Sequence, residues 1–422
     1  MTSNLKKKVS SKKYELTSCR ICKSEKLYPF LDLGYMPIPN GFIEKKDLKK
    51  LELTYPLRVC VCENCWLMQL QHVIPAEIMF RNYLYVPSTS KTMMKHFDQM
   101  AEETLKVAHA RKDNLVIDIG SNDGALLSLF KKRNVQILGI DPAENIVRDA
   151  NKRGIRTKCA FFSEEIGKET EQEFGKAKVI TATNVIAHID DLHSVVKGIK
   201  TLLHPQGVFV MEAPYVIDLI DNNEFDTIYH EHLSYFAVRP LMKLFEMYGM
   251  NIIDVRKQKI HGGTIRVYAA FAESNYEIHP RVSKFVTEET LKKLHLRNTY
   301  DEFARRVKVI KRDLVSFLKR IKKEGRTIIG YGASAKGNVL TNYCGISTDL
   351  LDYVVDSTPY KHGKYTPGTH IPIFPETKLD KETPDYALLM SWNFAEEIIE
   401  KNQKYREKGG QFIITIPYLK IV

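Results

Sequence analysis

Short apolar runs alternate with amphipathic stretches through the middle of the chain. Apolar strands are expected at 115–119, 136–141, 178–184 and 207–213, with helix-forming segments between them. A strand–helix rhythm of this kind is typical of a parallel sheet that helices cover on both faces. The sequence therefore predicts an α/β unit over residues 76–275.

The end of this unit differs from its middle, and a second alternation of strands and helices follows further along the chain. Two strand-like runs flank the tripeptide that begins at His261, which indicates a hairpin and antiparallel strands at the end of the sheet. Residues 276–324 are charged and helix-forming, so we expect connecting helices there. From 325 to 422 strands again alternate with helices after a glycine-rich turn, which predicts a second, Rossmann-like α/β unit.

The N-terminal part follows a different pattern. Residues 1–13 carry five lysines and no acidic residue, and we expect a disordered basic tail there. Residues 14–75 contain two C-x-x-C pairs separated by a loop rich in proline and glycine. The predicted fold is an α/β protein with a small N-terminal module and two Rossmann-like units.

Composition and charge narrow the class of protein. A chain of 422 residues with 44% hydrophobic and 27% charged residues is typical of a soluble protein of two or three domains. No apolar run is long enough to cross a membrane, and the basic N-terminus lacks the apolar core of a secretory signal, so we expect a cytoplasmic protein. The net charge of +12 falls to +7 without the five N-terminal lysines, and residues 281–326 carry mixed charges. We therefore expect no nucleic-acid partner and no membrane partner.

Five of the seven cysteines lie close to the N-terminus. Cys19 and Cys22 form one C-x-x-C pair, and Cys62 and Cys65 form the other. Each pair supplies two thiolates from one turn, and four thiolates suit a tetrahedral Zn²⁺ ion, although Cys60 could replace Cys62. Four protein ligands leave no open coordination position, so the expected zinc is structural.

A glycine turn follows the first central strand. The run D-I-G-S-N-D-G from Asp118 to Gly124 joins this strand to a helix, which is how a nucleotide-type cofactor is held at the carboxyl edge of a sheet. The pattern resembles the D/E-x-G-x-x-x-G motif of S-adenosylmethionine methyltransferases. Asp141 ends the next strand, where a carboxylate can accept the ribose hydroxyls. The expected cofactor contacts are Asp118, Gly120, Asn122, Asp123, Gly124, Asp141 and Asn184.

Residues 228–236, I-Y-H-E-H-L-S-Y-F, concentrate imidazole, carboxyl and phenol groups. An imidazole titrates near neutral pH, and phenols or a second imidazole can stabilise a developing oxyanion. Tyr229 and His232 are three residues apart and would lie on one side of a helix or turn, with His230 facing elsewhere. The segment is therefore a candidate apparatus for removing a proton.

These segments, in this order, resemble the nucleotide-sugar C-methyltransferases over about residues 15–422. The resemblance rests on the cysteine pairs, I-D-I-G-S-N-D-G, N-V-I-A-H, Y-H-E-H-L-S-Y-F, H-G-G-T-I-R and G-Y-G-A-S-A-K-G. It implies a zinc-binding module, a central class I methyltransferase domain and a C-terminal Rossmann-like domain that helps to hold the sugar nucleotide. It also implies methyl transfer from S-adenosylmethionine to a carbon, typically C3, of a 4-keto-6-deoxy sugar on a nucleoside diphosphate. By this resemblance the general base is His232, and the other catalytic pocket residues are Tyr229, Glu231, His188, Asn184 and Tyr83.

The late glycine turn supplies candidate substrate contacts. Gly332 would let the backbone approach a phosphate at a helix N-terminus, and Ser334 and Lys336 could add a hydroxyl and a charge. Asp356 ends the next strand, although this turn could also be kept for packing alone. The expected substrate contacts are Tyr83, His261, Gly332, Ser334, Lys336 and Asp356.

Other functions stay open at this point. An O- or N-methyltransferase acting on a nucleotide sugar would need a base but no ketone beside the acceptor atom. The alternatives of another class are a scaffold that only binds the nucleotide sugar and a zinc-containing protein that modifies or binds RNA. We expect a monomer or a weak homo-oligomer.

Overall fold

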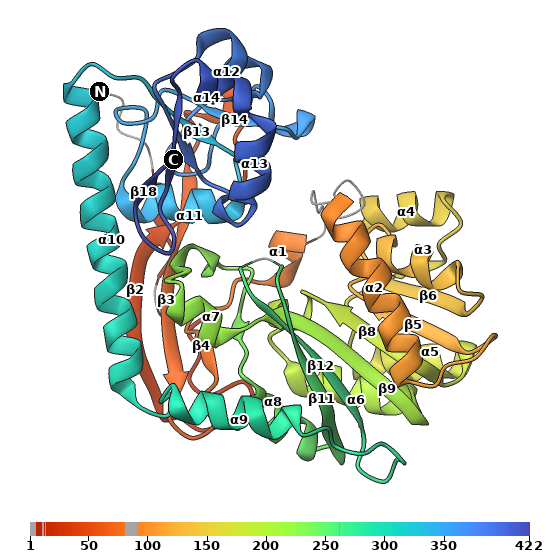
Figure 1. The fold of residues 1–422 in the computed structure, drawn as a ribbon. Coiled ribbons are helices and arrows are strands. Elements are labelled where there is room, and N and C mark those ends of the chain that lie inside the picture. The colour runs from red at the N-terminus through yellow and green to blue at the C-terminus, as the bar shows by residue number, and fades with distance from the viewer. Residues whose placement is uncertain (1–5, 11, 13, 81–90, 261) are drawn as a thin grey trace.

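The computed structural model describes residues 6–10, 12, 14–80, 91–260 and 262–422, and arranges them around three sheets (Figure 1). The sheets follow one another along the chain, except that one short central strand, β10, joins the sheet of the N-terminal module. None of the helices in the described ranges is long and apolar enough to cross a membrane.

The first sheet is built on the long strand β3, which pairs antiparallel with β2 and β4 and parallel with β1. Strand β1 lies within the segment for which we expected a disordered tail. That expectation is wrong for Lys6–Lys8, because their backbone groups pair with Glu52–Thr54 of β3. The elements are β1 (Lys6–Lys8), β2 (Leu27–Met36), η1 (Lys45–Asp47), β3 (Glu52–Cys62), β4 (Met68–Leu70) and α1 (Ala76–Phe80).

The second sheet has seven strands in the order β11-β12-β9-β8-β5-β6-β7. All five residues of β5 are buried, as expected for a parallel strand covered on both faces. The neighbouring strands β9, β8, β5, β6 and β7 are parallel. The antiparallel hairpin β11–β12 closes the sheet, as its sequence predicted. The strands are β5 (Leu115–Ile119), β6 (Gln136–Asp141), β7 (Thr157–Cys159), β8 (Ala177–Thr183), β9 (Leu203–Pro214), β11 (Met250–Gln258) and β12 (Thr264–Phe271).

Helices connect and cover the strands of this central sheet (Figure 1). Helix α5 packs against α6, and α2 packs against α3. The helices are α2 (Lys91–Val107), α3 (Ala125–Lys131), α4 (Glu144–Lys152), α5 (Glu164–Phe174), η3 (Ile186–His188), α6 (Leu192–Leu202), α7 (Val216–Asp221), η4 (Phe225–Thr227) and α8 (Val238–Glu246).

Two helices lead to the third sheet, as the charged helix-forming segment predicted. Helix α9 spans Arg281–Leu291 and α10 spans Arg297–Lys323. Buried apolar residues recur along α10 from Tyr300 to Ile321, and this face contacts both β2 of the module and α11 of the C-terminal unit. In Figure 1, α10 runs along one side of the molecule beside both of these units.

The third sheet has the strand order β15-β14-β13-β16-β17-β18 and is parallel except for β18. Its first strand runs into a glycine turn and then into α11, as expected for a Rossmann-like unit. The elements are β13 (Ile328–Tyr331), α11 (Ala335–Cys344), β14 (Val354–Asp356), η5 (Pro359–Lys361), β15 (Ile373–Pro375), α12 (Thr377–Glu382), β16 (Tyr386–Leu389), η6 (Trp392–Phe394), α13 (Ala395–Lys401), α14 (Gln403–Glu407), β17 (Gln411–Ile414) and β18 (Lys420–Ile421).

Strand β10 (Ser234–Tyr235) ties the central unit to the N-terminal module. It pairs antiparallel with β4, although it lies between α7 and α8 in the sequence. The preceding Leu233 donates its N–H to the carbonyl of Ala187 at 2.7 Å and accepts from the N–H of Leu70 at 3.0 Å. The segment that carries the imidazoles is therefore held between β4 and η3.

Candidate active site

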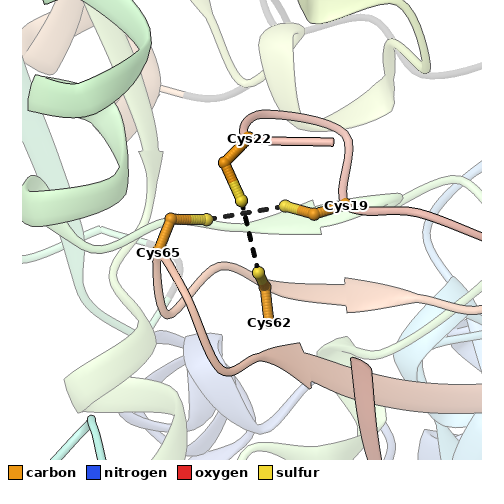
Figure 2. Close-up of side chains that lie close together, drawn as sticks. All are labelled: Cys19, Cys22, Cys62 and Cys65. Atoms are coloured by element: carbon orange, nitrogen blue, oxygen red, sulfur yellow. Dashed lines mark hydrogen bonds between the residues drawn. The ribbon is translucent and has the colours of Figure 1, made fainter. Parts of the chain in front are cut away.

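Four cysteines of the N-terminal module converge on one point (Figure 2). The sulfur of Cys19 lies 3.5 Å from that of Cys65, and the sulfur of Cys22 lies 3.5 Å from that of Cys62. All four sulfurs lie within 4.8 Å of one another. Four sulfur ligands at this spacing fit a tetrahedral Zn²⁺ ion and leave no open coordination position for a substrate.

The two cysteine pairs sit on turns of the same shape. Lys23 and Trp66, which directly follow the two C-x-x-C pairs, both have positive φ angles, at 57° and 65°. Their N–H groups bond back to the carbonyls of Cys19 and Cys62, at 3.0 and 2.8 Å. These turns bring both thiols of a pair to one side. Cys60 is not in this group, and burial raises the pKa of its thiol to about 12.

The central glycine turn packs directly against the segment that carries His188. Gly120 has a φ of +67°, and a Cβ atom there would lie 2.6 Å from the side chain of Val185. Such a close approach requires glycine in this backbone conformation. The glycine turn and the Asn184–His188 segment are therefore in contact.

The acidic residues of the glycine turn have different partners. Asp118 is buried, accepts a hydrogen bond of 2.6 Å from the Thr181 hydroxyl, and has its pKa raised to about 7 by burial. Asp123 is also buried and lies 3.6 Å from the guanidinium of Arg153. Thr181 had no sequence signal, because a threonine inside a strand is common in any parallel sheet.

Asp141 lies at the end of β6, next to the glycine turn. Its two carboxylate oxygens accept the backbone N–H groups of Asn122 and Ala143, each at 2.9 Å. These bonds fix the carboxylate, and each oxygen keeps a lone pair for a hydroxyl donor. Neighbouring strands bring the turn and this acid to one edge, where the turn fits the methionine part of S-adenosylmethionine and the acid fits its ribose.

The imidazoles of His188 and His232 meet beside this edge. Their ring centroids lie 4.9 Å apart in an edge-to-face arrangement, and the Tyr229 ring lies 4.0 Å from that of His232. The Nδ1 atom of His232 is 2.8 Å from the carbonyl oxygen of Thr227. A carbonyl can only accept, so Nδ1 carries the proton of the neutral ring and Nε2 is the basic nitrogen.

Burial shifts the pKa of the other titratable groups of this cluster. It lowers the pKa of His188 to about 4, so this ring is neutral at neutral pH. It raises the pKa of Glu231 to about 7, and an amide of Asn40 opposes that shift. Asn184 has a φ of +54°, with its N–H bonded to the carbonyl of Glu212 at 2.9 Å, at the end of β8.

His230 lies apart from this cluster, as the spacing predicted. Its ring is buried 6.0 Å from that of Tyr55 on β3, and burial lowers its pKa to about 4. Tyr83 and His261, two further predicted contacts, lie outside the described residues.

The predicted contacts of the C-terminal turn are engaged within the protein. The Ser334 hydroxyl accepts the N–H of Gly337 at 3.0 Å and donates to the carbonyl of Met390 at 2.7 Å. Asp356 accepts the N–H of Ala333 at 2.7 Å and pairs with Lys361 at 3.0 Å.

The Lys336 ammonium lies 4.4 Å from the centre of the Trp392 ring, and this indole donates to Asp226 of the central unit at 2.7 Å. Gly332 has a φ of +88°, and a Cβ there would lie 2.5 Å from the Ser391 hydroxyl. The roles of Gly332, Ser334, Lys336 and Asp356 toward a substrate stay predictions.

Three family models match consecutive parts of the chain. Residues 19–80 match "Putative zinc binding domain", residues 94–255 match "Methyltransferase domain", and residues 259–417 match "C-methyltransferase C-terminal domain". The zinc model and the cluster of four sulfurs agree on a zinc-binding N-terminal module.

Some similar proteins match only part of the chain, whereas another matches nearly all of it. The solved magnesium protoporphyrin IX methyltransferase of Synechocystis, with bound SAH, is 13% identical, with a TM-score of 0.34, and the match covers 45% of this chain and 90% of that one. A ubiquinone biosynthesis O-methyltransferase of Cupriavidus pinatubonensis is 27% identical over 32% of this chain and 62% of its own length. The C-methyltransferase NovU of Streptomyces niveus is 36% identical over 96% of this chain and 97% of its own length. The chain therefore belongs to the S-adenosylmethionine-dependent C-methyltransferases.

Proposed function

We propose that this C-methyltransferase acts on a 4-keto-6-deoxy sugar linked to a nucleoside diphosphate and methylates the carbon beside the ketone, C3. The observation that carries the proposal is the edge-to-face pair of His188 and His232, with Tyr229 beside it. A C–H bond becomes acidic enough to break when the adjacent carbonyl can take up the charge. A base and a neutral donor next to each other are the groups that such a step requires.

His232 is the proposed base. The carbonyl of Thr227 accepts its Nδ1–H, so the lone pair of Nε2 can take the proton from C3. The Tyr229 ring packs against one face of the imidazole and limits its rotation. His232 would then hold the proton as an imidazolium until the product leaves.

His188 is the proposed donor to the oxygen of the enolate. Burial lowers its pKa to about 4, which keeps the ring neutral, and a neutral imidazole can donate one N–H without becoming a competing acid. Tyr229 is the second candidate for this donation. S-adenosylmethionine, when bound, would supply an electrophilic methyl group to the carbanionic C3 and leave as S-adenosylhomocysteine.

The glycine turn and Asp141 are proposed to orient the methyl donor. Gly120 packs against Val185, three residues before His188, so the methyl donor and His188 would lie on one side of the site. A zinc ion held by the four cysteines would have no open coordination position, so its proposed role is to hold the module rather than to contact the sugar.

A panel of nucleotide-linked 4-keto-6-deoxy sugars tests this proposal. Each is incubated with S-adenosylmethionine, and mass spectrometry looks for the gain of one methylene unit. Proton and carbon NMR of the product then show whether the new methyl group is on carbon, oxygen or nitrogen. Methylation of oxygen or nitrogen, or no transfer to any keto sugar while the enzyme binds its methyl donor, would refute the proposed substrate.

A further inference from the structure

An asparagine of the zinc-binding module contacts the segment of the central unit that carries Glu231 and His232. The Asn40 side-chain nitrogen donates to a carboxyl oxygen of Glu231 at 2.6 Å, although the two residues are 191 positions apart. The Glu231 side chain is only 2% exposed. A buried carboxyl must have a hydrogen-bond partner, and within the described residues no cation pairs with this one. The amide of Asn40 is therefore the group that orients it.

The loop that carries Asn40 is itself fixed from two sides. The N–H of Gly41 bonds to the carbonyl of Ile38 at 3.0 Å, which closes a turn around Asn40. The carbonyl of Pro39 accepts from the side chain of Asn338, on α11 of the C-terminal unit, at 2.7 Å. Asn338 is only 1% exposed. The module, the catalytic segment and the C-terminal unit thus meet at this one loop.

From this geometry we propose that Asn40 is a positioning residue, which holds one oxygen of Glu231 and so presents the other oxygen to the substrate. The proposal rests on the proposed function, because Glu231 lies between His230 and His232 in the segment assigned to proton removal. A neutral donor suits this task better than a lysine or arginine. It fixes the carboxyl without placing a positive charge that would compete with the proton on His232.

The first test is kinetic. Asn40→Ala should lower kcat about ten- to a hundredfold, as expected for the loss of a hydrogen bond to an acidic group, and leave the affinity for S-adenosylmethionine unchanged. Tyr28→Phe is the matched control. It removes one hydrogen bond of 2.9 Å between the module and Asp301 of α10, and should leave kcat unchanged. Equal losses of kcat in both variants would mean that any contact of the module has the same effect, and would overturn the proposal.

The second test uses a nearly isosteric change. In Asn40→Asp the introduced carboxyl can donate only when it is protonated. The ratio of variant to wild-type kcat should therefore rise as the pH falls, whereas a purely structural defect would lower this ratio equally at every pH. A ratio that is independent of pH would contradict the positioning role. This variant also serves if Asn40→Ala does not fold.

The third test needs no substrate, so it separates this inference from the proposed function. Carbon NMR of protein labelled at the glutamate carboxyl, with the signal of Glu231 assigned by its loss in Glu231→Gln, follows the titration of this group. Asn40 favours the charged form, so Asn40→Ala should move the midpoint to higher pH. An unchanged midpoint overturns the proposal. If the midpoint shifts but the enzyme methylates no keto sugar, the contact between Asn40 and Glu231 is supported and only the proposed sugar substrate is refuted.

Discussion

At the residue scale, the tautomer of His232 decides which of its atoms can take a proton. The Thr227 carbonyl fixes the proton on Nδ1, and this contact lies within the same short segment of chain. The sequence pattern predicts that this imidazole is the base. It could not identify the reactive nitrogen, because that depends on a carbonyl group whose position only the folded backbone sets.

Replacing this imidazole should slow proton removal and spare binding of the methyl donor. His232→Asn should lower kcat by about 10²–10⁴-fold, which is the usual contribution of a general base. Calorimetry should give an unchanged affinity for S-adenosylmethionine, because its proposed site lies on β5 and β6. With S-adenosylhomocysteine present, the wild-type enzyme should exchange the proton next to the sugar ketone in D₂O. Equally fast exchange by the variant would assign the base to His188 or Tyr229 instead.

The buried Glu231 carboxyl should make stability depend on pH. Burial raises its pKa from 4.5 to about 7, so between these pH values the folded protein keeps a proton that the unfolded chain releases. Stability is therefore lost as the pH rises through this window. Glu231→Gln cannot titrate, so its free energy of unfolding relative to wild type should rise by up to about 3 kcal/mol from pH 4 to pH 8. Urea unfolding at both pH values checks this, and a difference that does not vary with pH would contradict it.

At the scale of single elements, the ends of neighbouring strands build the proposed binding site for the methyl donor. Strands β5 and β6 are parallel neighbours, so the glycine turn after one and Asp141 at the end of the other share an edge. The apolar strands, the hairpin and this edge could be predicted because each signal lies within a few consecutive residues. Strand β1 could not, because its three lysines pair through backbone atoms that carry no sequence signal.

Asp141→Ala should weaken binding of S-adenosylmethionine. Each hydrogen bond to a charged group contributes about 1.5–3 kcal/mol, so the dissociation constant should rise at least tenfold. Asp149→Ala is a suitable control because this acidic residue is exposed on α4 nearby. This variant should bind S-adenosylmethionine with the affinity of wild type. Calorimetry on both variants measures the change. An unaltered affinity in Asp141→Ala would remove this residue from the ribose site.

At the scale of the whole molecule, the zinc-binding module is part of the framework around the proposed catalytic centre. It contributes β4, which pairs with β10, and the Asn40 loop, which contacts both other units. The sequence predicted the four ligands of the metal from their spacing. It could not predict the contact between Asn40 and Glu231, because no local pattern relates two segments so far apart along the chain.

Loss of one zinc ligand should therefore affect catalysis as well as folding. Cys62→Ser should reduce the bound zinc below one ion per chain, lower the melting temperature and reduce methyl transfer, because metal affinity at a structural site is folding free energy. Cys60→Ser, a buried neighbour outside the four ligands, should keep its zinc. Metal analysis and thermal unfolding decide between them. Full zinc in Cys62→Ser, or its loss in Cys60→Ser, would show that Cys60 is a ligand.

The pairing of β4 with β10 also has a consequence during synthesis on the ribosome. Strand β4 ends at Leu70, but its partner begins at Ser234, so more than a third of the chain must be translated before the two can meet. Until then the backbone edge that β10 will cover is open, and an open strand edge is a template for aggregation. We expect the nascent chain to be most vulnerable over this interval, and chaperones that bind exposed strand edges to raise the yield of active enzyme.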